Sequence, residues 1–285
     1  MTGDAALGRT SRRLRDLVEP IAAGVYFAPE ATAGYEVLGL DWFEGYFCSR
    51  SACLGKAPWT VVCGAFGVFE PSVVEQFVTS GWAKTDPEPV LAARLAGAEA
   101  SLERLAGSPT GEVARATEIL RSLTDGLDVA GRALFAGLAA LSKPTSPWGA
   151  LWRAADLVRE RRGDAHVAAW IPYFDACEIN LVTELAWGLP PRSFVLTRGW
   201  KDDALDAAYA RLESRGLVES ESLTGAGRRL RGDVERATDQ AERAVIERLA
   251  DDADELFALL EPWSKAIIGG KGYPIDPSAL PDVRG

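Results

Sequence analysis

The sequence predicts a mainly α-helical protein. Apolar residues recur at helical spacing through most of the 285 residues. Several prolines stand where they suit the first turn of a helix, and the only stretches typical of strands are short ones near residues 216–227. The length allows one large domain or two modest ones.

The composition is that of a globular protein and narrows the class of function. Hydrophobic residues make up 47% of the chain and charged residues 25%, and 31 basic against 41 acidic residues give a net charge of −10. This balance disfavours a protein whose main task is to grip a phosphate backbone. No run approaches the roughly 18 apolar residues of a membrane span, and the polar N-terminus lacks a signal peptide, so we expect a cytoplasmic protein.

The first part of the chain is expected to form a multi-helix, pocket-forming domain over residues 1–188. Pro58, Pro71 and Pro147 each suit a helix start. Amphipathic spacing and these starts predict helices at 12–23, 41–54, 58–66, 71–80, 89–105, 111–123, 127–141 and 147–162. Asp164 is expected to cap a further helix that ends near Pro172.

The next predicted helix begins with paired carboxylates. Asp175 and Glu178 have the spacing of a capping box, which explains them without a catalytic role, although a general acid and base pair is the alternative. Gly188 is expected to end this helix. Glu184, further along it, is a candidate substrate-binding residue, with a surface charge as the alternative.

From residue 189 to 268 the pattern changes to that of a winged helix. We expect a short helix at 192–197, an amphipathic helix at 202–215, short strands at 216–219 and 222–227 (the latter alternatively a helix cap), and charged helices at 228–249 and 253–268. Residues 269–285 are expected to be irregular. This order resembles a winged helix-turn-helix of the MarR type with a short two-stranded wing.

Winged helices usually bind DNA, but the residues here argue against it. Bases are read mostly by Arg, Lys, Asn and Gln. The candidate recognition helix instead opens with Asp202, Asp203 and Asp206, which phosphates would repel. Arg228 and Arg229 near the wing could touch phosphates, yet we expect a structural or dimerisation role for the module and no specific DNA binding.

Two residues are candidates for catalysis. His166, the only histidine, follows the predicted cap Asp164, so the helix dipole should lower its pKa and keep the imidazole neutral for use as a base or a ligand donor. The alternative is a buried histidine that satisfies a turn. Arg50 lies among small and aromatic residues and needs an anionic partner, either a carboxylate of the protein or one of a ligand.

An aromatic cluster could wall a substrate pocket beside Arg50. Its members are Trp42, Tyr46, Trp59, Phe66 and Phe69, and Tyr46 lies one helical turn before Arg50. Ordinary core packing is the alternative.

No cofactor and no metal are expected. The nucleotide-binding, zinc-protease and nucleophile-elbow motifs are missing from the sequence. Cys48, Cys53, Cys63 and Cys177 lack C-x-x-C spacing and are expected to be buried thiols, with a reactive Cys48 or Cys53 as the alternative. His166 as an axial haem ligand is the remaining cofactor possibility.

Three stretches of the chain resemble the SalK-like helix-turn-helix proteins of actinobacteria, namely residues 45–71, 151–170 and 188–239. The resemblance implies a helical domain joined to a winged helix and a place in natural-product gene clusters, without an established reaction. Cys53 stands where the family pattern has proline, and Gly67 and Val68 stand where it has Tyr-Asn, which implies a divergent pocket.

Three functions remain open at this stage. The first is a cofactor-independent tailoring enzyme of secondary metabolism (cyclisation, isomerisation or hydrolysis) that binds a small anionic substrate through Arg50 and uses His166 as base or acid. The second is a non-catalytic ligand carrier or partner subunit of a biosynthetic complex. The third is a ligand-responsive transcriptional regulator, and a homodimer is possible in each case.

Overall fold

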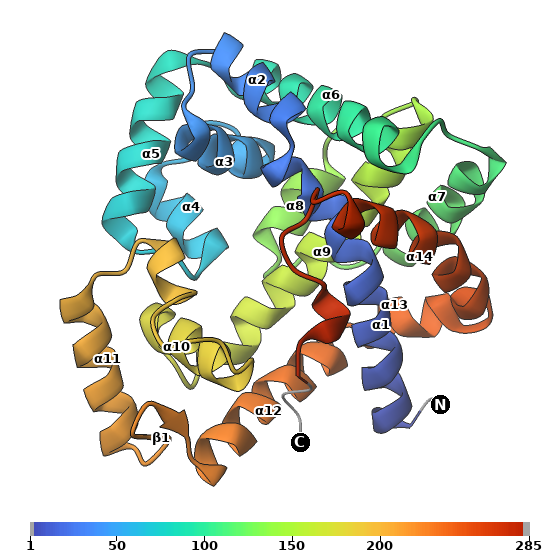
Figure 1. The fold of residues 1–285 in the computed structure, drawn as a ribbon. Helices are drawn as coiled ribbons and strands as arrows, with labels where there is room; N and C mark the ends of the chain where they lie inside the picture. Colours follow the sequence, from blue (N-terminus) through green and yellow to red (C-terminus); the bar gives the residue numbers. More distant parts are fainter. Residues whose placement is uncertain (1–2, 282–285) are drawn as a thin grey trace.

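The computed structural model describes residues 3–281 and confirms a mainly α-helical protein with one small antiparallel sheet (Figure 1). The helices of the first part are α1 (Asp4–Ala23), α2 (Pro29–Val37), α3 (Trp42–Ser51), α4 (Trp59–Phe66), α5 (Pro71–Lys84), α6 (Pro87–Ala106), α7 (Gly111–Thr124), α8 (Ala133–Ala139) and α9 (Pro147–Trp170). The later elements are α10 (Ala176–Ala186), α11 (Asp202–Ser214), β1 (Val218–Glu219), β2 (Ser222–Leu223), α12 (Gly225–Ala241), α13 (Arg243–Leu249) and α14 (Ala253–Gly269). Short 3₁₀ turns are η1 (Gly24–Phe27), η2 (Ala52–Leu54), η3 (Val195–Arg198), η4 (Ala250–Asp252) and η5 (Pro277–Ala279).

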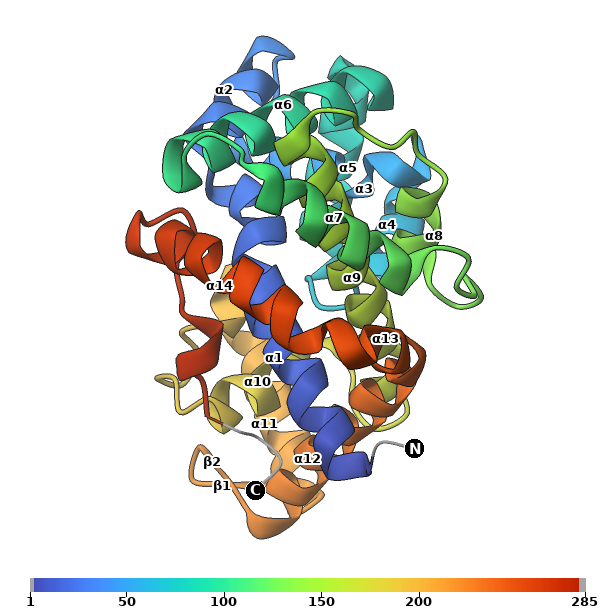
Figure 2. The ribbon, with the colours of Figure 1, turned by 90° about the vertical axis from the view of Figure 1, so that its right-hand side faces the viewer.

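Helix α9 is the centre of the molecule. It packs against α1, α6, α7, α8 and α12, and Figures 1 and 2 both show α1 lying alongside it. Its buried residues occupy most of its circumference, as expected of a helix surrounded by protein. Several of them are charged, among them Asp156, Glu160 and Asp164, so α9 brings polar groups into the interior.

The predicted break in α9 is wrong. The helix was expected to end at Arg162 and a new one to start at Asp164, but it continues to Trp170. Asp164 caps a different helix: its carboxylate accepts the backbone N–H of Phe135 at 2.9 Å, at the start of α8. Tertiary packing therefore carries the helix through Gly163, which by propensity alone favours a stop.

Three other stretches of the chain also differ from the predicted helices. Residues 24–37 form η1 and α2, which the sequence did not predict. The helix expected over 127–141 is confined to α8, and the one expected over 228–249 is divided at Glu242 into α12 and α13. In both cases local amphipathic spacing overstates how far the backbone stays helical.

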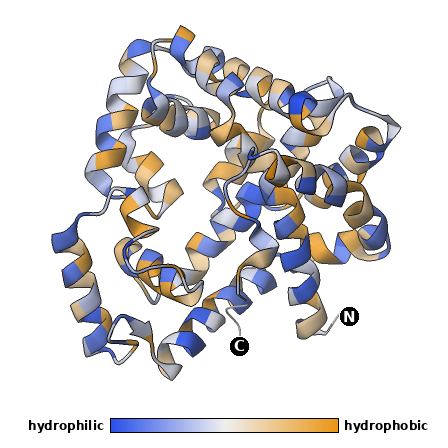
Figure 3. Ribbon diagram, in the orientation of Figure 1, coloured by the Kyte–Doolittle hydropathy of each residue, from blue (hydrophilic) through white to orange (hydrophobic). Residues whose placement is uncertain are grey.

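The winged helix is formed by α10, η3, α11, the β1–β2 hairpin and α12. Val218 pairs with Leu223 in the hairpin, and its two-residue turn has positive φ at Ser220 (49°) and Glu221 (56°), as a tight hairpin turn requires. The Thr224 side chain accepts the N–H of Gly227 at 3.1 Å and caps α12. Along α12 hydrophilic and hydrophobic residues are mixed (Figure 3), and its buried side includes Arg231, Glu235 and Asp239 as well as Val234.

Apolar packing joins α13 and α14 to the first part of the chain. One large hydrophobic cluster runs from Leu7 to Val158 and includes Val245 to Ile267. A second cluster runs from Trp170 to Val234. The division of the chain into units at residues 188 and 268 stays a prediction. None of the helices in residues 3–281 combines the length and apolar character needed to cross a bilayer.

Candidate functional site

A cavity of about 300 Å³ lies between the two hydrophobic clusters, and both predicted catalytic residues, Arg50 and His166, line it. Its apolar walls include Leu14 and Val18 of α1 and Ile179 of α10. This volume is at the lower end of the range for small-molecule sites, and a boundary between packed units is a common place for them.

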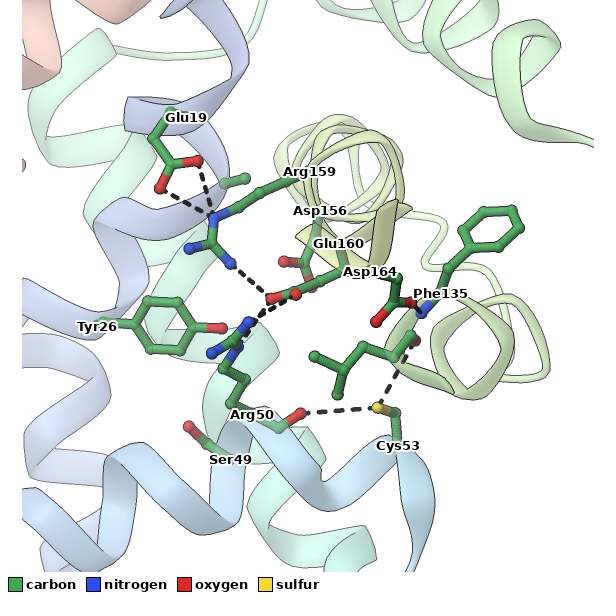
Figure 4. A network of polar contacts seen from close by, with 12 residues as sticks. Glu19, Tyr26, Ser49, Arg50, Cys53, Phe135, Asp156, Arg159, Glu160 and Asp164 are labelled. Atoms are coloured by element: carbon green, nitrogen blue, oxygen red, sulfur yellow. Dashed lines mark hydrogen bonds and ion pairs between the residues drawn. The ribbon is translucent and has the colours of Figure 1, made fainter. Parts of the chain in front are cut away.

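An ion-pair network forms one end of the cavity (Figure 4). Arg50 binds Glu160 through two hydrogen bonds of 3.0 and 2.9 Å, and Arg159 lies 3.0–3.1 Å from both oxygens of Glu19 and also contacts Glu160. Burial opposes ionisation of Glu160, but Arg50 and Arg159 outweigh it and lower the pKa of this carboxyl to about 2. The anionic partner of Arg50 is therefore a carboxylate of the protein, one of the two partners that the sequence left open.

A second buried ion pair lies beside this network on α9. Arg94 of α6 lies 3.1 Å from Asp156 and donates to the hydroxyl of Tyr26 at 2.6 Å. Burial raises the pKa of Asp156 and, further along α9, raises that of Asp164 to about 6. These contacts hold α6, η1 and α8 against the face of α9 that carries Glu160.

Arg198 of η3 lines the cavity and has no acidic partner among residues 3–281. Its guanidinium stacks over the rings of Phe194 (4.5 Å to the centroid) and Phe69 (5.3 Å), and its Nε is buried without a hydrogen bond. Burial, together with the neighbouring cations Arg50 and Arg159, lowers the pKa of Arg198. An arginine in this setting is complementary to an anion.

The other cations in the cavity wall are compensated. Six arginines and four glutamates of the described residues line it, which gives a formal charge of +2 in a chain of charge −10. The five arginines within ion-pair distance of a carboxylate are Arg15, Arg50, Arg159, Arg162 and Arg231. Some of the carboxylates that pair with these five arginines do not line the cavity, which is why the formal charge of the wall is +2. Among residues 3–281, Arg198 is therefore the one lining cation whose charge no carboxylate compensates.

His166 lies in the last two turns of α9. Its Nδ1 is 3.1 Å from the Thr238 hydroxyl, which itself donates to the carbonyl of Val234 at 2.9 Å. The hydroxyl proton is thus in use, so Nδ1 of His166 donates and Nε2 carries the lone pair. Burial and the cations Arg231 and Arg162 lower the pKa of His166 to about 3.

The sequence predicts a neutral imidazole because of the helix dipole. The lowered pKa agrees with a neutral imidazole, but the reason is wrong. His166 does not follow a helix N-terminus but lies near the C-terminal end of α9, where the helix dipole favours the charged form. Removal from water overrides that effect.

The aromatic cluster lies behind the cavity rather than in its wall. Phe66 and Phe69 are buried; Arg50 stacks over Phe66 at 4.3 Å, and Phe69 contacts Arg198. Tyr46 lies between Trp42 and the phenylalanines, Trp42 is 44% exposed, and Trp59 is partly buried against the core. None of the five is among the residues that line the cavity, and of these only Phe66 and Phe69 stack against the two arginines.

Glu184 is fully buried, so its interpretation as a surface charge is wrong. Its carboxylate accepts the backbone N–H groups of Arg192, Phe194 (2.6 Å) and Val195 (3.1 Å). It does not line the cavity. Glu184 instead fixes the segment that carries Phe194 and Arg198.

The sequence did not single out several residues of the cavity. Arg198 directly follows the short helix expected over 192–197, and Arg159 and Glu160 fall in a charged run typical of a solvated face. Trp187 and Phe194, which meet edge to face at 5.4 Å, supply aromatic surface on the α10 side of the cavity. The run 194–198, in which one arginine follows three apolar residues and Thr197 and precedes Gly199, was the available signal.

Three cations on or beside α11 already have acidic partners. Arg211 and Arg215 of α11 contact Glu178, whose capping box with Asp175 is confirmed. Arg192 lies 2.6 Å from Asp206. The exposed surface of α11 therefore offers little net positive charge to a phosphate backbone.

The cysteines and acidic groups do not gather into a metal site in the part of the chain that the structure describes. The four cysteines are free thiols, and burial raises the pKa of Cys48, Cys53 and Cys177 to about 12.

Comparison with known proteins identifies the family. No curated protein and no solved structure matches the chain. A family model described as a helix-turn-helix family matches residues 11–274, which include every lining residue of the cavity. The chain therefore belongs to this helix-turn-helix family.

Proposed function

We propose that the protein binds a small anionic molecule in the cavity and converts it as a cofactor-independent enzyme of secondary metabolism. The observation that carries the proposal is the presence of an uncompensated cation, Arg198, and a neutral imidazole with a free Nε2, His166, in one cavity. The SalK-like resemblance supports the metabolic setting.

In this proposal Arg198 holds the anion. A guanidinium pairs with a carboxylate through two parallel hydrogen bonds, and burial strengthens them. Arg50 and Arg159 are already bound to Glu160 and Glu19, so they contribute positive potential behind the anion rather than direct contact.

His166 is the proton acceptor. The pKa of about 3 keeps the imidazole unprotonated across the physiological range but makes it a weak base. A bound anion adds negative charge to the cavity and raises this pKa, which strengthens the base when the ligand is present. Proton transfer of this kind suits an isomerisation, cyclisation or hydrolysis.

The winged helix is proposed to be MarR-like in shape but without a role in specific DNA binding. The acidic start of α11 and the paired state of Arg211 and Arg215 support this. A homodimer or a biosynthetic partner protein stays a prediction.

Turnover of small organic acids, followed by mass spectrometry, tests the proposal. The wild type should convert at least one acid that it binds, His166→Gln should bind that acid without converting it, and Arg198→Met should lose binding. Binding without conversion by the wild type would identify a carrier. Wild-type behaviour of both variants would contradict the proposed site.

A further inference from the structure

We infer that the ligand is a monocarboxylic acid with a flat apolar body that lies on α9 against Gly163, between Arg159 and His166. This inference rests on the proposed function and deepens it by naming the ligand class and the residue that makes room for it.

Gly163 leaves open space in the wall of the cavity. It lines the cavity, and a Cβ built on it would meet only Oε2 of Glu160, at 3.5 Å, which is ordinary contact. Gly149 in the same helix differs, because its Cβ would lie 2.5 Å from the Ser146 hydroxyl. A glycine inside a helix lowers stability relative to alanine. Packing thus explains why residue 149 is glycine. At residue 163 the surrounding protein leaves room for a side chain, so packing does not explain the glycine.

The spacing along α9 gives the length of the ligand. Arg159, Gly163 and His166 are separated by four and three residues, so they share one face of the helix. A rise of about 1.5 Å per residue places Arg159 and His166 about 10 Å apart along the axis. A molecule that reaches from the arginines to the imidazole across Gly163 therefore has about the length of a two-ring compound.

The walls and charges give the chemical class. Val18, Ile179 and the Trp187–Phe194 pair supply apolar and aromatic surface. Arg198 is the one lining cation of residues 3–281 without a carboxylate partner, so it matches one negative charge. A carboxylate carries that charge in the planar form that a guanidinium binds, whereas a phosphate monoester carries nearly two.

Titration calorimetry with 2-naphthoate, 2-naphthamide and 2-naphthyl phosphate tests the inference. We expect the wild type to bind the carboxylate at least about tenfold more tightly than the amide or the phosphate. Gly163→Leu should weaken binding of the carboxylate at least about tenfold, and Gly163→Ala should weaken it less, because each added group occupies the ligand's place.

The matched control is Gly64→Ala. Gly64 lies in α4 outside the cavity, and a Cβ there would meet nothing within 4 Å. Both alanine variants should raise the melting temperature, and only Gly163→Ala should lose affinity. If Gly163→Leu does not fold, Gly163→Ala against Gly64→Ala decides the question.

Three results would overturn the inference. Equal binding of 2-naphthoate by Gly163→Leu and the wild type would remove Gly163 from the ligand seat. Equal affinity for the amide or the phosphate would contradict the class. Failure of the wild type to bind any of the three compounds at millimolar concentration would also contradict the ligand class. The proposed function would still be tested separately, by the turnover assay on Arg198→Met and His166→Gln.

Discussion

Arg198 and His166 are partly buried ionisable side chains that line the cavity, and each has binding groups that no other residue occupies. A buried cation without a counter-charge destabilises a fold, and a buried imidazole resists protonation. Arg198 retains Phe194 and Phe69 as stacking partners but no carboxylate, and His166 uses only one ring nitrogen in a hydrogen bond. Both therefore have binding capacity that the folded protein leaves unused.

Arg198→Met should leave the protein as stable as the wild type or raise its melting temperature, because methionine keeps the apolar contact with Phe194 and removes the uncompensated charge. Affinity for an anionic ligand should fall by about 1.5–3 kcal/mol, the range for a hydrogen bond to a charged group. Thermal denaturation and calorimetry measure both effects. Arg50→Met is the control and should lower the melting temperature, because it removes one of the cations that neutralise the Glu160 carboxylate. A lowered melting temperature for Arg198→Met would mean that Arg198 has a structural role.

The stability contributed by His166 should depend on pH. The unfolded side chain has a pKa of about 6.5, whereas the folded one has a pKa of about 3. Below pH 6.5 the unfolded chain takes up a proton that the folded protein does not, so the free energy of unfolding falls as the pH falls towards 3 and is constant above 6.5. At pH 5 the loss is about 2 kcal/mol.

Denaturant unfolding of the wild type and His166→Gln at pH 7.5 and pH 5 measures this loss. Between pH 7.5 and pH 5 the free energy of unfolding of the wild type should fall by about 2 kcal/mol more than that of the variant. Groups such as Glu160 titrate in both proteins, so their contribution cancels in this comparison. A difference independent of pH would show that His166 is not held neutral by burial.

At the scale of elements, α9 and η3 place the site. Helix α9 carries Arg159, Glu160 and His166 on surfaces that face α1, α3 and α12. Ion pairs connect it to α1 and α3, and a hydrogen bond of His166 connects it to α12. The η3 turn has little regular structure of its own and depends on Glu184, which accepts three of the N–H groups around it. Precise placement of Arg198 therefore depends on a carboxylate outside the cavity.

Glu184→Ala should destabilise the protein by about 1–3 kcal/mol, because buried N–H groups lose their acceptor, and it should weaken ligand binding although Glu184 does not line the cavity. Asp175→Ala is the matched control at the start of the same helix: loss of its cap costs about 1 kcal/mol and should leave binding unchanged. Calorimetry on both variants separates the two cases. Equal loss of binding in both would mean that general destabilisation, not placement of η3, is responsible.

The elements that the sequence predicts well are those whose signals are local. The capping box of Asp175 and Glu178 and the hairpin before Thr224 depend on neighbours within a few residues, and both are confirmed. The break at Gly163 was wrong because Asp164 finds its partner on α8, which local reasoning cannot see. Arg198 was missed for a similar reason, since its importance comes from the absence of a partner in three dimensions.

At the scale of the whole molecule, the cavity lies where two hydrophobic clusters meet. Leu14, Val158 and Val245 belong to the larger cluster and Ile179 to the smaller one. The cavity wall is positive although the chain carries a charge of −10. This contrast favours a small anion inside and disfavours a long polyanion outside.

Selection from a random DNA duplex pool should therefore enrich no sequence. Replacement of Asp202 and Asp203 by lysine should create non-specific binding that added salt removes, because it restores positive charge to the start of α11. A gel-shift titration in salt measures this. Enrichment of a palindromic site by the wild type would support the regulator instead.

The most direct test of the central claim is native mass spectrometry of the protein mixed with small organic acids. We predict that the wild type retains one acid per chain, that Gly64→Ala retains it equally, and that Arg198→Met retains none. An acid retained to the same extent by Arg198→Met, or a wild type that stays bare with every acid, would contradict the assignment of the cavity as an anion-binding site.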